Sequence, residues 1–169
     1  MTVTKFEEEN ELSFEVPKNK VMKLLSEGVL VTVGSCKIEQ KWCIRGASEG
    51  VPYSSRIRKT TDLTGKIPYS HEYTMKYYVT HTSRIEINSD ISAEEYDTIS
   101  KLHPHGKEIS KTRLTVRPNV LVVEYSGPTY QIDIFPNNKA IIEVEFKSDE
   151  QRKAFKKPEW LFKLTEGEQ

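Results

Sequence analysis

Hydrophobic and polar residues alternate along most of the chain, in short runs separated by Gly-, Pro- and Asn-rich segments. In one such run Ile85 and Ile87 alternate with Arg84, Glu86 and Asn88. Successive side chains of a strand point to opposite faces, so each run predicts a strand with one apolar and one polar face. The spacing of the turn signals predicts an antiparallel barrel or sandwich.

Three segments follow a helical period instead. Residues 17–27 place Val21, Leu24 and Leu25 on one stripe and end at Gly28, a residue typical of helix C-termini. The sequences at 92–95 and 148–151 have the pattern of N-terminal capping boxes, so each predicts the start of a helix. Strands with a few helices predict an α+β fold, and 169 residues without a linker or repeat predict a single domain spanning 1–169.

The polar faces of the predicted strands are sorted by charge. Any single polar face is explained simply by exposure to water, but a solvated sheet surface usually mixes signs, because opposite charges stabilise cross-strand pairs and like charges do not. Within each strand the charged residues share a parity and a sign: acidic at Glu9 and Glu11 and at Glu143 and Glu145, and basic at Arg56 and Arg58, at Lys76, and at Lys111 and Arg113.

The helices indicate which face is inside. If the apolar faces pointed into a barrel, the helices would have no surface against which to bury their own stripes. We therefore expect a closed antiparallel β-barrel of about eight strands, with the helices outside and the charged faces lining a bore that has room for one small ligand. Unpaired charge in a bore is costly. A polyphosphate carrying Mg²⁺ or Mn²⁺ would balance it, because the phosphates pair with the basic side chains and the metal pairs with the carboxylates.

At these positions the sequence resembles the CYTH family, the triphosphate tunnel metalloenzymes. The family's opening Glu-x-Glu-x-Lys motif is matched in part by Glu9-Asn-Glu11-Leu-Ser13. Further landmarks follow in family order over nearly the whole chain: Arg56-Ile-Arg58, Thr74-Met-Lys76, Arg84-Ile-Glu86, Lys111-Thr-Arg113, Tyr130-Gln-Ile-Asp133-Ile-Phe135, and Glu143-Val-Glu145 with Pro158-Glu-Trp160-Leu161.

The resemblance implies roles for these residues. It implies a triphosphate tunnel in which Glu9, Glu11, Arg56, Arg58 and Lys76 carry catalysis. The substrate triphosphate would be bound by Arg56, Arg58, Lys76, Arg84, Lys111 and Arg113. Mg²⁺ or Mn²⁺ would be held by Glu9, Glu11, Glu86, Asp133, Glu143 and Glu145. Lys37 and Lys41, which share a parity on a long strand, are not assigned to the site.

The sequence also departs from the family pattern. Ser13 replaces the family lysine, Asn88 replaces a second acidic residue found in many members, and Gln131 replaces a glutamate. The leading hypothesis is metal-dependent hydrolysis of inorganic triphosphate or of a small organic or nucleoside triphosphate. The alternatives are a class IV adenylyl cyclase, which makes cyclic AMP and pyrophosphate from ATP, and a non-catalytic protein that sequesters a nucleotide or polyphosphate.

Composition restricts the partners. Lys+Arg and Asp+Glu are equal at 25 each, so net charge gives no long-range attraction to nucleic acid or an anionic membrane. An RNA 5′-triphosphate end stays open as a substrate. The two cysteines, Cys36 and Cys43, make no disulfide framework. No signal sequence is visible and no apolar run approaches about 18 residues, so we expect a cytoplasmic protein. We expect it to be a monomer or a homodimer.

Overall fold

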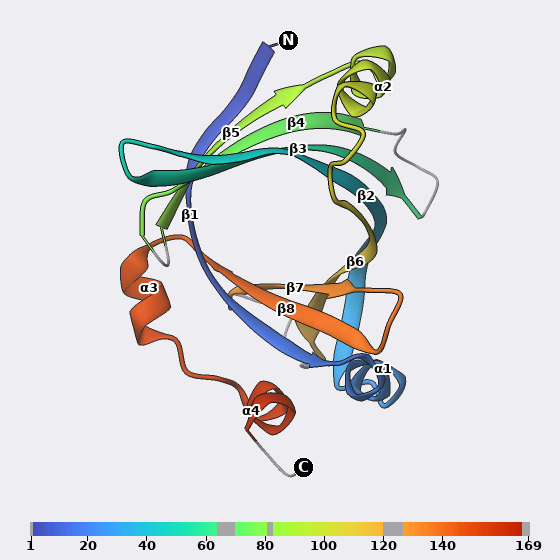
Figure 1. Ribbon diagram of the computed structural model, residues 1–169. Helices are drawn as coiled ribbons and strands as arrows, with labels where there is room; N and C mark the ends of the chain where they lie inside the picture. Colours follow the sequence, from blue (N-terminus) through green and yellow to red (C-terminus); the bar gives the residue numbers. More distant parts are fainter. Residues whose placement is uncertain (1, 64–69, 81–82, 120–126, 167–169) are drawn as a thin grey trace. The chain divides into compact units, whose positions relative to one another are not determined.

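The computed structural model describes residues 2–63, 70–80, 83–119 and 127–166, with side chains described from residue 10 onward except at residue 83 (Figure 1). It divides into two compact units. Unit 1 contains residues 1–9 and 36–110, and unit 2 contains residues 10–35 and 111–169. Strands β1, β2 and β6 have residues in both units. The assignment of a single domain stays a prediction.

Within the described residues the chain forms eight strands and four helices, which alternate irregularly along the sequence. The strands are β1 (Thr2–Pro17), β2 (Leu30–Ser48), β3 (Val51–Asp62), β4 (Ser70–Tyr78), β5 (Ser83–Asp90), β6 (Glu108–Pro118), β7 (Thr129–Ile134) and β8 (Lys139–Phe146). The helices are α1 (Lys18–Ser26), α2 (Ala93–Leu102), α3 (Asp149–Ala154) and α4 (Glu159–Thr165).

Unit 2 is built on strands in the order β2–β6–β7–β8–β1. The pairs β6–β7, β7–β8 and β8–β1 are antiparallel, and their register places Ile142 opposite both Ile132 and Phe14. Side chains of this parity form the core of the unit together with helical residues. The fully or nearly buried members are Val16, Val21, Leu30, Val116, Tyr130, Ile132, Ala140, Ile142, Val144, Trp160 and Leu161.

The helices of unit 2 pack on this apolar face. Helix α1 contributes Val21 and is followed by Gly28 at φ +73°, so the predicted helix end is confirmed. Helix α3 begins after Ser148, whose hydroxyl accepts from the Gln151 amide as predicted. Helix α4 was not predicted, because its seven residues are too few to display a helical period. Its Trp160 ring meets the Tyr130 ring edge-on at 5.1 Å.

Unit 1 contains an antiparallel sheet in the order β5–β4–β3–β2. Strands β2 and β3 form a hairpin whose turn residues Glu49 and Gly50 both have positive φ, as a tight hairpin turn requires. Helix α2 starts with the predicted capping box between Ser92 and Glu95. It lies on the sheet face that contains the fully buried Ile57.

Each unit therefore buries the apolar faces of its strands beneath helices. This confirms the predicted α+β class, the antiparallel sheet and the helices on the apolar strand faces. Closure into a barrel stays a prediction. In the described part of the chain, no helix has the length and apolar character needed to cross a bilayer.

Helix α4 offers a direct test of which face is the core. Leu161 is fully buried, whereas its neighbour Phe162 is 51% exposed. We expect Leu161→Ala to lower the free energy of unfolding by about 2–5 kcal/mol, because it leaves a cavity. Phe162→Ala should change it by only about 0.5 kcal/mol. Urea denaturation followed by circular dichroism measures both, and equal losses would contradict this placement of the core.

Candidate functional site

The residues of unit 1 predicted to bind phosphate share one sheet face. The register pairs Arg56 with Thr74 and Thr74 with Asn88, all of one parity. Arg56 is 7% exposed. Beside it the Thr74 hydroxyl donates to the Asn88 amide oxygen at 2.7 Å, and both residues are buried. We call the set Arg56, Arg58, Lys76 and Arg84 the basic face.

Two members of the basic face are held by polar neighbours. Lys76 Nζ lies 3.2 Å from Glu86 Oε2, with side chains only 13% and 7% exposed. Arg58 donates from Nε and Nη2 to the Gln40 side-chain oxygen at 3.2 and 3.1 Å. The sequence suggested Glu86 as a metal ligand; in the structure it neutralises Lys76. An anion bound at Lys76 would therefore share this lysine with Glu86.

Aromatic rings lie against two of the arginines. The Arg56 guanidinium carbon is 5.8 Å from the centre of the Trp42 ring, and that of Arg84 is 5.5 Å from the Tyr78 ring. Such contacts hold a guanidinium plane without neutralising its charge. Sequence reasoning missed Gln40 and Trp42 as neighbours of this face, although their even parity on β2 is the signal that places them there.

The opposite face of the same sheet is structural. Lys41 has the other parity, and its ammonium donates to the Ser100 carbonyl of α2 at 2.8 Å. Lys37 pairs with Glu39 at 3.3 Å. Neither lysine was assigned to the predicted site, and Lys41 contacts the helix that covers this face.

Unit 2 carries a second charged face, opposite its apolar core. We call Lys111, Arg113, Asp133 and Glu143 the mixed face. Both Asp133 oxygens are occupied: Oδ1 accepts from Arg113 Nε at 2.7 Å, and Oδ2 accepts from Arg113 Nη2 at 2.9 Å and from Lys111 Nζ at 2.6 Å. The Asp133 side chain is 2% exposed.

The pKa of Asp133 reflects this environment. Burial alone would raise it, but the hydrogen bonds and charges of Arg113 and Lys111 outweigh burial and hold the pKa below its usual value. The contribution of Asp133 to stability is therefore present above the pKa of an unfolded aspartate and lost as the pH falls through the lower, folded pKa.

Glu143 has the opposite balance. Burial raises its pKa; Arg113, whose Nη2 lies 3.6 Å from Glu143 Oε2, opposes the rise, while the charges of Glu11 and Asp133 add to it. Its cross-strand neighbours, Ser13 on β1 and Gln131 on β7, bring no positive charge. The buried Gln131 Oε1 also has no hydrogen-bond partner in the part of the chain that the structure describes.

The carboxylate oxygens of unit 2 are the kind of ligand that a divalent cation such as Mg²⁺ prefers. Glu11 lies directly opposite Glu145 across β1 and β8, and Glu143 follows two residues away on the same face. Within the described residues, no three acidic, His or Cys side chains are gathered into a ready-made metal cage. Mg²⁺ needs only one or two carboxylates when phosphates supply other ligands, so Glu11 with Glu143 or Glu145 would be the residues to hold it. The Glu9 side chain lies outside the described residues.

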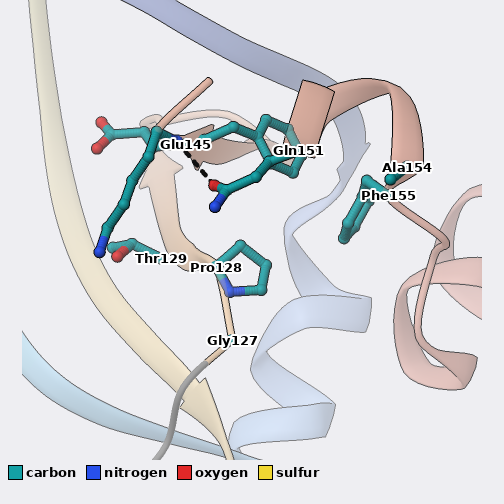
Figure 2. Close-up of a pocket in the computed structure, with 9 residues that line it drawn as sticks. Gly127, Pro128, Thr129, Glu145, Gln151, Ala154 and Phe155 are labelled. Atoms are coloured by element: carbon teal, nitrogen blue, oxygen red, sulfur yellow. Dashed lines mark hydrogen bonds between the residues drawn. The ribbon is translucent and has the colours of Figure 1, made fainter. Parts of the chain in front are cut away.

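A pocket opens where Glu145 ends the acidic run of β8 (Figure 2). Its volume is about 540 Å³, within the range of roughly 300–1,000 Å³ typical of small-molecule sites. The Gln151 side-chain oxygen accepts from the Lys147 backbone at 3.1 Å, and Figure 2 shows its amide nitrogen pointing toward Pro128 and Thr129. Phe155 closes another side (Figure 2).

Comparison with solved structures identifies similar folds. The PH1819 protein from Pyrococcus horikoshii OT3 is 16% identical with a TM-score of 0.58, over 85% of this chain and 82% of that one. A candidate adenylate cyclase from Bacillus halodurans is 13% identical with a TM-score of 0.57, over 89% and 87%. The inorganic triphosphatase NE1496 is 19% identical over 93% of this chain and 83% of that one, with a TM-score of 0.43. No family model and no curated protein matches the chain.

The strained ionisation of Glu143 has a measurable consequence. The pKa of Glu143 is raised in the folded state. The contribution of Glu143 to the free energy of unfolding is therefore fully present below the pKa of an unfolded glutamate and is lost as the pH rises through the folded pKa. In metal-free buffer, we expect Glu143→Gln to raise the melting temperature at pH 7, with a gain that shrinks toward pH 4. Differential scanning calorimetry across this range measures it; a lower melting temperature at pH 7 would show that the Arg113 contact outweighs burial.

Proposed function

We propose that this chain hydrolyses inorganic triphosphate or a small organic or nucleoside triphosphate with the help of Mg²⁺ or Mn²⁺, and that it is a triphosphate tunnel metalloenzyme. The observation that carries the proposal is the sorting of side chains in both units. Each sheet packs its apolar face beneath helices and places charged residues, several of them buried, on the other face. Buried charge at this density is typical of a site that binds a charged ligand.

The basic residues supply phosphate recognition in this proposal. Arginine presents a planar fork of donors that matches phosphate oxygens, and lysine adds a point charge. We assign Arg56, Arg58, Lys76 and Arg84 of unit 1, and Lys111 and Arg113 of unit 2, to the substrate. The fold shared with a candidate adenylate cyclase agrees with this assignment, since ATP also carries a triphosphate.

The acidic residues Glu11, Glu143 and Glu145, together with Glu9, would hold the metal. These carboxylates would hold a cation whose chemistry would be neutralisation of phosphate charge and activation of water. The rise in the pKa of Glu143 supports this role, because a cation would relieve the same repulsion and desolvation that disfavour its ionised form.

Two other functions have support from particular observations. The pocket beside Glu145 has room for an organic group, which suits a cyclase or an organic triphosphatase. Ser13, an exposed residue opposite Glu143, stands where the resembled family has lysine, and this favours a protein that binds polyphosphate without turning it over.

Product analysis distinguishes the three functions. Purified protein is given inorganic triphosphate, ATP, GTP or thiamine triphosphate with Mg²⁺ or Mn²⁺. We expect release of orthophosphate. Cyclic nucleotide with pyrophosphate would instead identify a cyclase, and binding without products a sequestering protein. Absence of binding to every polyphosphate would overturn the proposal.

Arg56 and Lys37 form a matched pair for testing the basic face. We expect Arg56→Ala to lower kcat/KM for the substrate by roughly ten- to hundredfold, because it removes charged hydrogen bonds to phosphate. Lys37→Ala, on the opposite face of the sheet, should leave kcat/KM within about twofold. Circular dichroism should show that both variants fold. Similar kcat/KM values for the two variants would contradict the assignment of the basic face.

The departure at Ser13 can be reversed. Ser13→Lys places a cation opposite Glu143, where a cross-strand pair is worth about 0.2–1 kcal/mol. We expect this variant to lower the pKa of Glu143 and to increase the turnover rate, measured as orthophosphate released at saturating substrate. Ser13→Gln, of similar length but neutral, is the control. An equal gain in both variants would show that side-chain size, and not charge, matters here.

A further inference from the structure

The carboxylate of Asp133 is saturated by its own neighbours. Three N–H donors from Lys111 and Arg113 reach its two oxygens at 2.6–2.9 Å. The register keeps this arrangement in place, since Arg113 lies directly opposite Asp133 across β6 and β7. Lys111 Nζ is further placed 5.8 Å from the centre of the Phe135 ring.

A metal ligand needs a different environment. Mg²⁺ requires near-octahedral geometry and keeps several of its waters, so a carboxylate that binds it must face open space. Asp133 is 1% exposed, and the groups at its oxygens are two cations. A divalent ion at this carboxylate would displace those donors and then lie beside two positive charges.

We propose that Asp133 is a positioning residue for phosphate recognition and not a metal ligand. It holds the Arg113 guanidinium by a two-point contact and fixes the Lys111 ammonium beside it, so that the remaining N–H groups of both are presented in one geometry. This inference rests on the proposed function, and it assigns Asp133 to the substrate half of the site.

The neighbouring glutamate explains why positioning matters. Arg113 Nη2 already lies 3.6 Å from Glu143 Oε2. This single, longer contact does not hold the guanidinium at two points as Asp133 does. Without Asp133, Arg113 therefore loses its fixed orientation toward the substrate.

Two binding measurements without turnover test the inference. Inorganic triphosphate is titrated in EDTA by calorimetry, and Mn²⁺ alone is titrated by electron paramagnetic resonance. We expect Asp133→Asn to weaken triphosphate binding by roughly ten- to hundredfold, the effect of disturbing hydrogen bonds to charged groups, with Mn²⁺ affinity within about twofold. The matched variant Glu143→Gln should weaken Mn²⁺ binding instead. Loss of Mn²⁺ affinity in Asp133→Asn, or unchanged triphosphate affinity, would overturn the inference.

Asp133→Asn leaves two buried cations without their carboxylate and could therefore fail to fold. A double mutant keeps the inference testable in that case. Arg113→Gln combined with Asp133→Asn replaces the ion pair by a neutral amide pair. If Asp133 acts through Arg113 and Lys111, adding Asp133→Asn to Arg113→Gln weakens triphosphate binding by less than the roughly tenfold or greater loss expected for Asp133→Asn alone, and the remaining loss comes from Lys111. A full additional loss, or a new loss of Mn²⁺ affinity, would identify an independent role.

The wild-type titrations separate this inference from the proposed function. Wild-type protein that binds triphosphate and Mn²⁺, with an Asp133→Asn variant that loses only Mn²⁺, overturns the positioning role and leaves the proposed function standing. Wild-type protein that binds no triphosphate in EDTA or with Mn²⁺ overturns the proposed function itself.

Discussion

Burial of one face of each sheet beneath helices is the constraint on which the rest of the structure depends. In unit 2, α1, α3 and α4 cover a core that includes Ile132, Ile142 and Leu161. Burial of such side chains contributes about 1.5–3 kcal/mol each. Since strand side chains alternate, fixing the apolar face also fixes the other, and the charged residues must share it.

The charged faces carry a cost that the apolar faces offset. Burying an ion pair usually contributes little net stability, because desolvation cancels much of the attraction, whereas removing one partner is strongly destabilising. Asp133 with Lys111 and Arg113 is such a group, and Lys76 with Glu86 is another. Their retention is better explained by the geometry they impose on cations than by stability.

The charges of the mixed face are not balanced equally at each carboxylate. Asp133 has a lowered pKa because its partners outweigh burial, whereas Glu143 has a raised pKa because burial and neighbouring carboxylates outweigh Arg113. Two acidic residues on neighbouring strands are therefore in opposite electrostatic states. The first is suited to a fixed structural charge, and the second to a charge that a cation would stabilise.

The sequence by itself determined the alternation of the strands, the shared face of the charged residues singled out on β3, β6 and β8, and the starts of α2 and α3, because alternation and capping are local properties. It did not predict α4, which is too short to show a period and forms by burying Trp160 and Leu161 against the sheet. Nor did it predict which charges pair: the contact of Glu86 with Lys76, the neighbours Gln40 and Trp42, and the saturation of Asp133 arise from cross-strand register. Register depends on contacts between residues far apart in the chain, so only the tertiary structure decided the environment of each site residue.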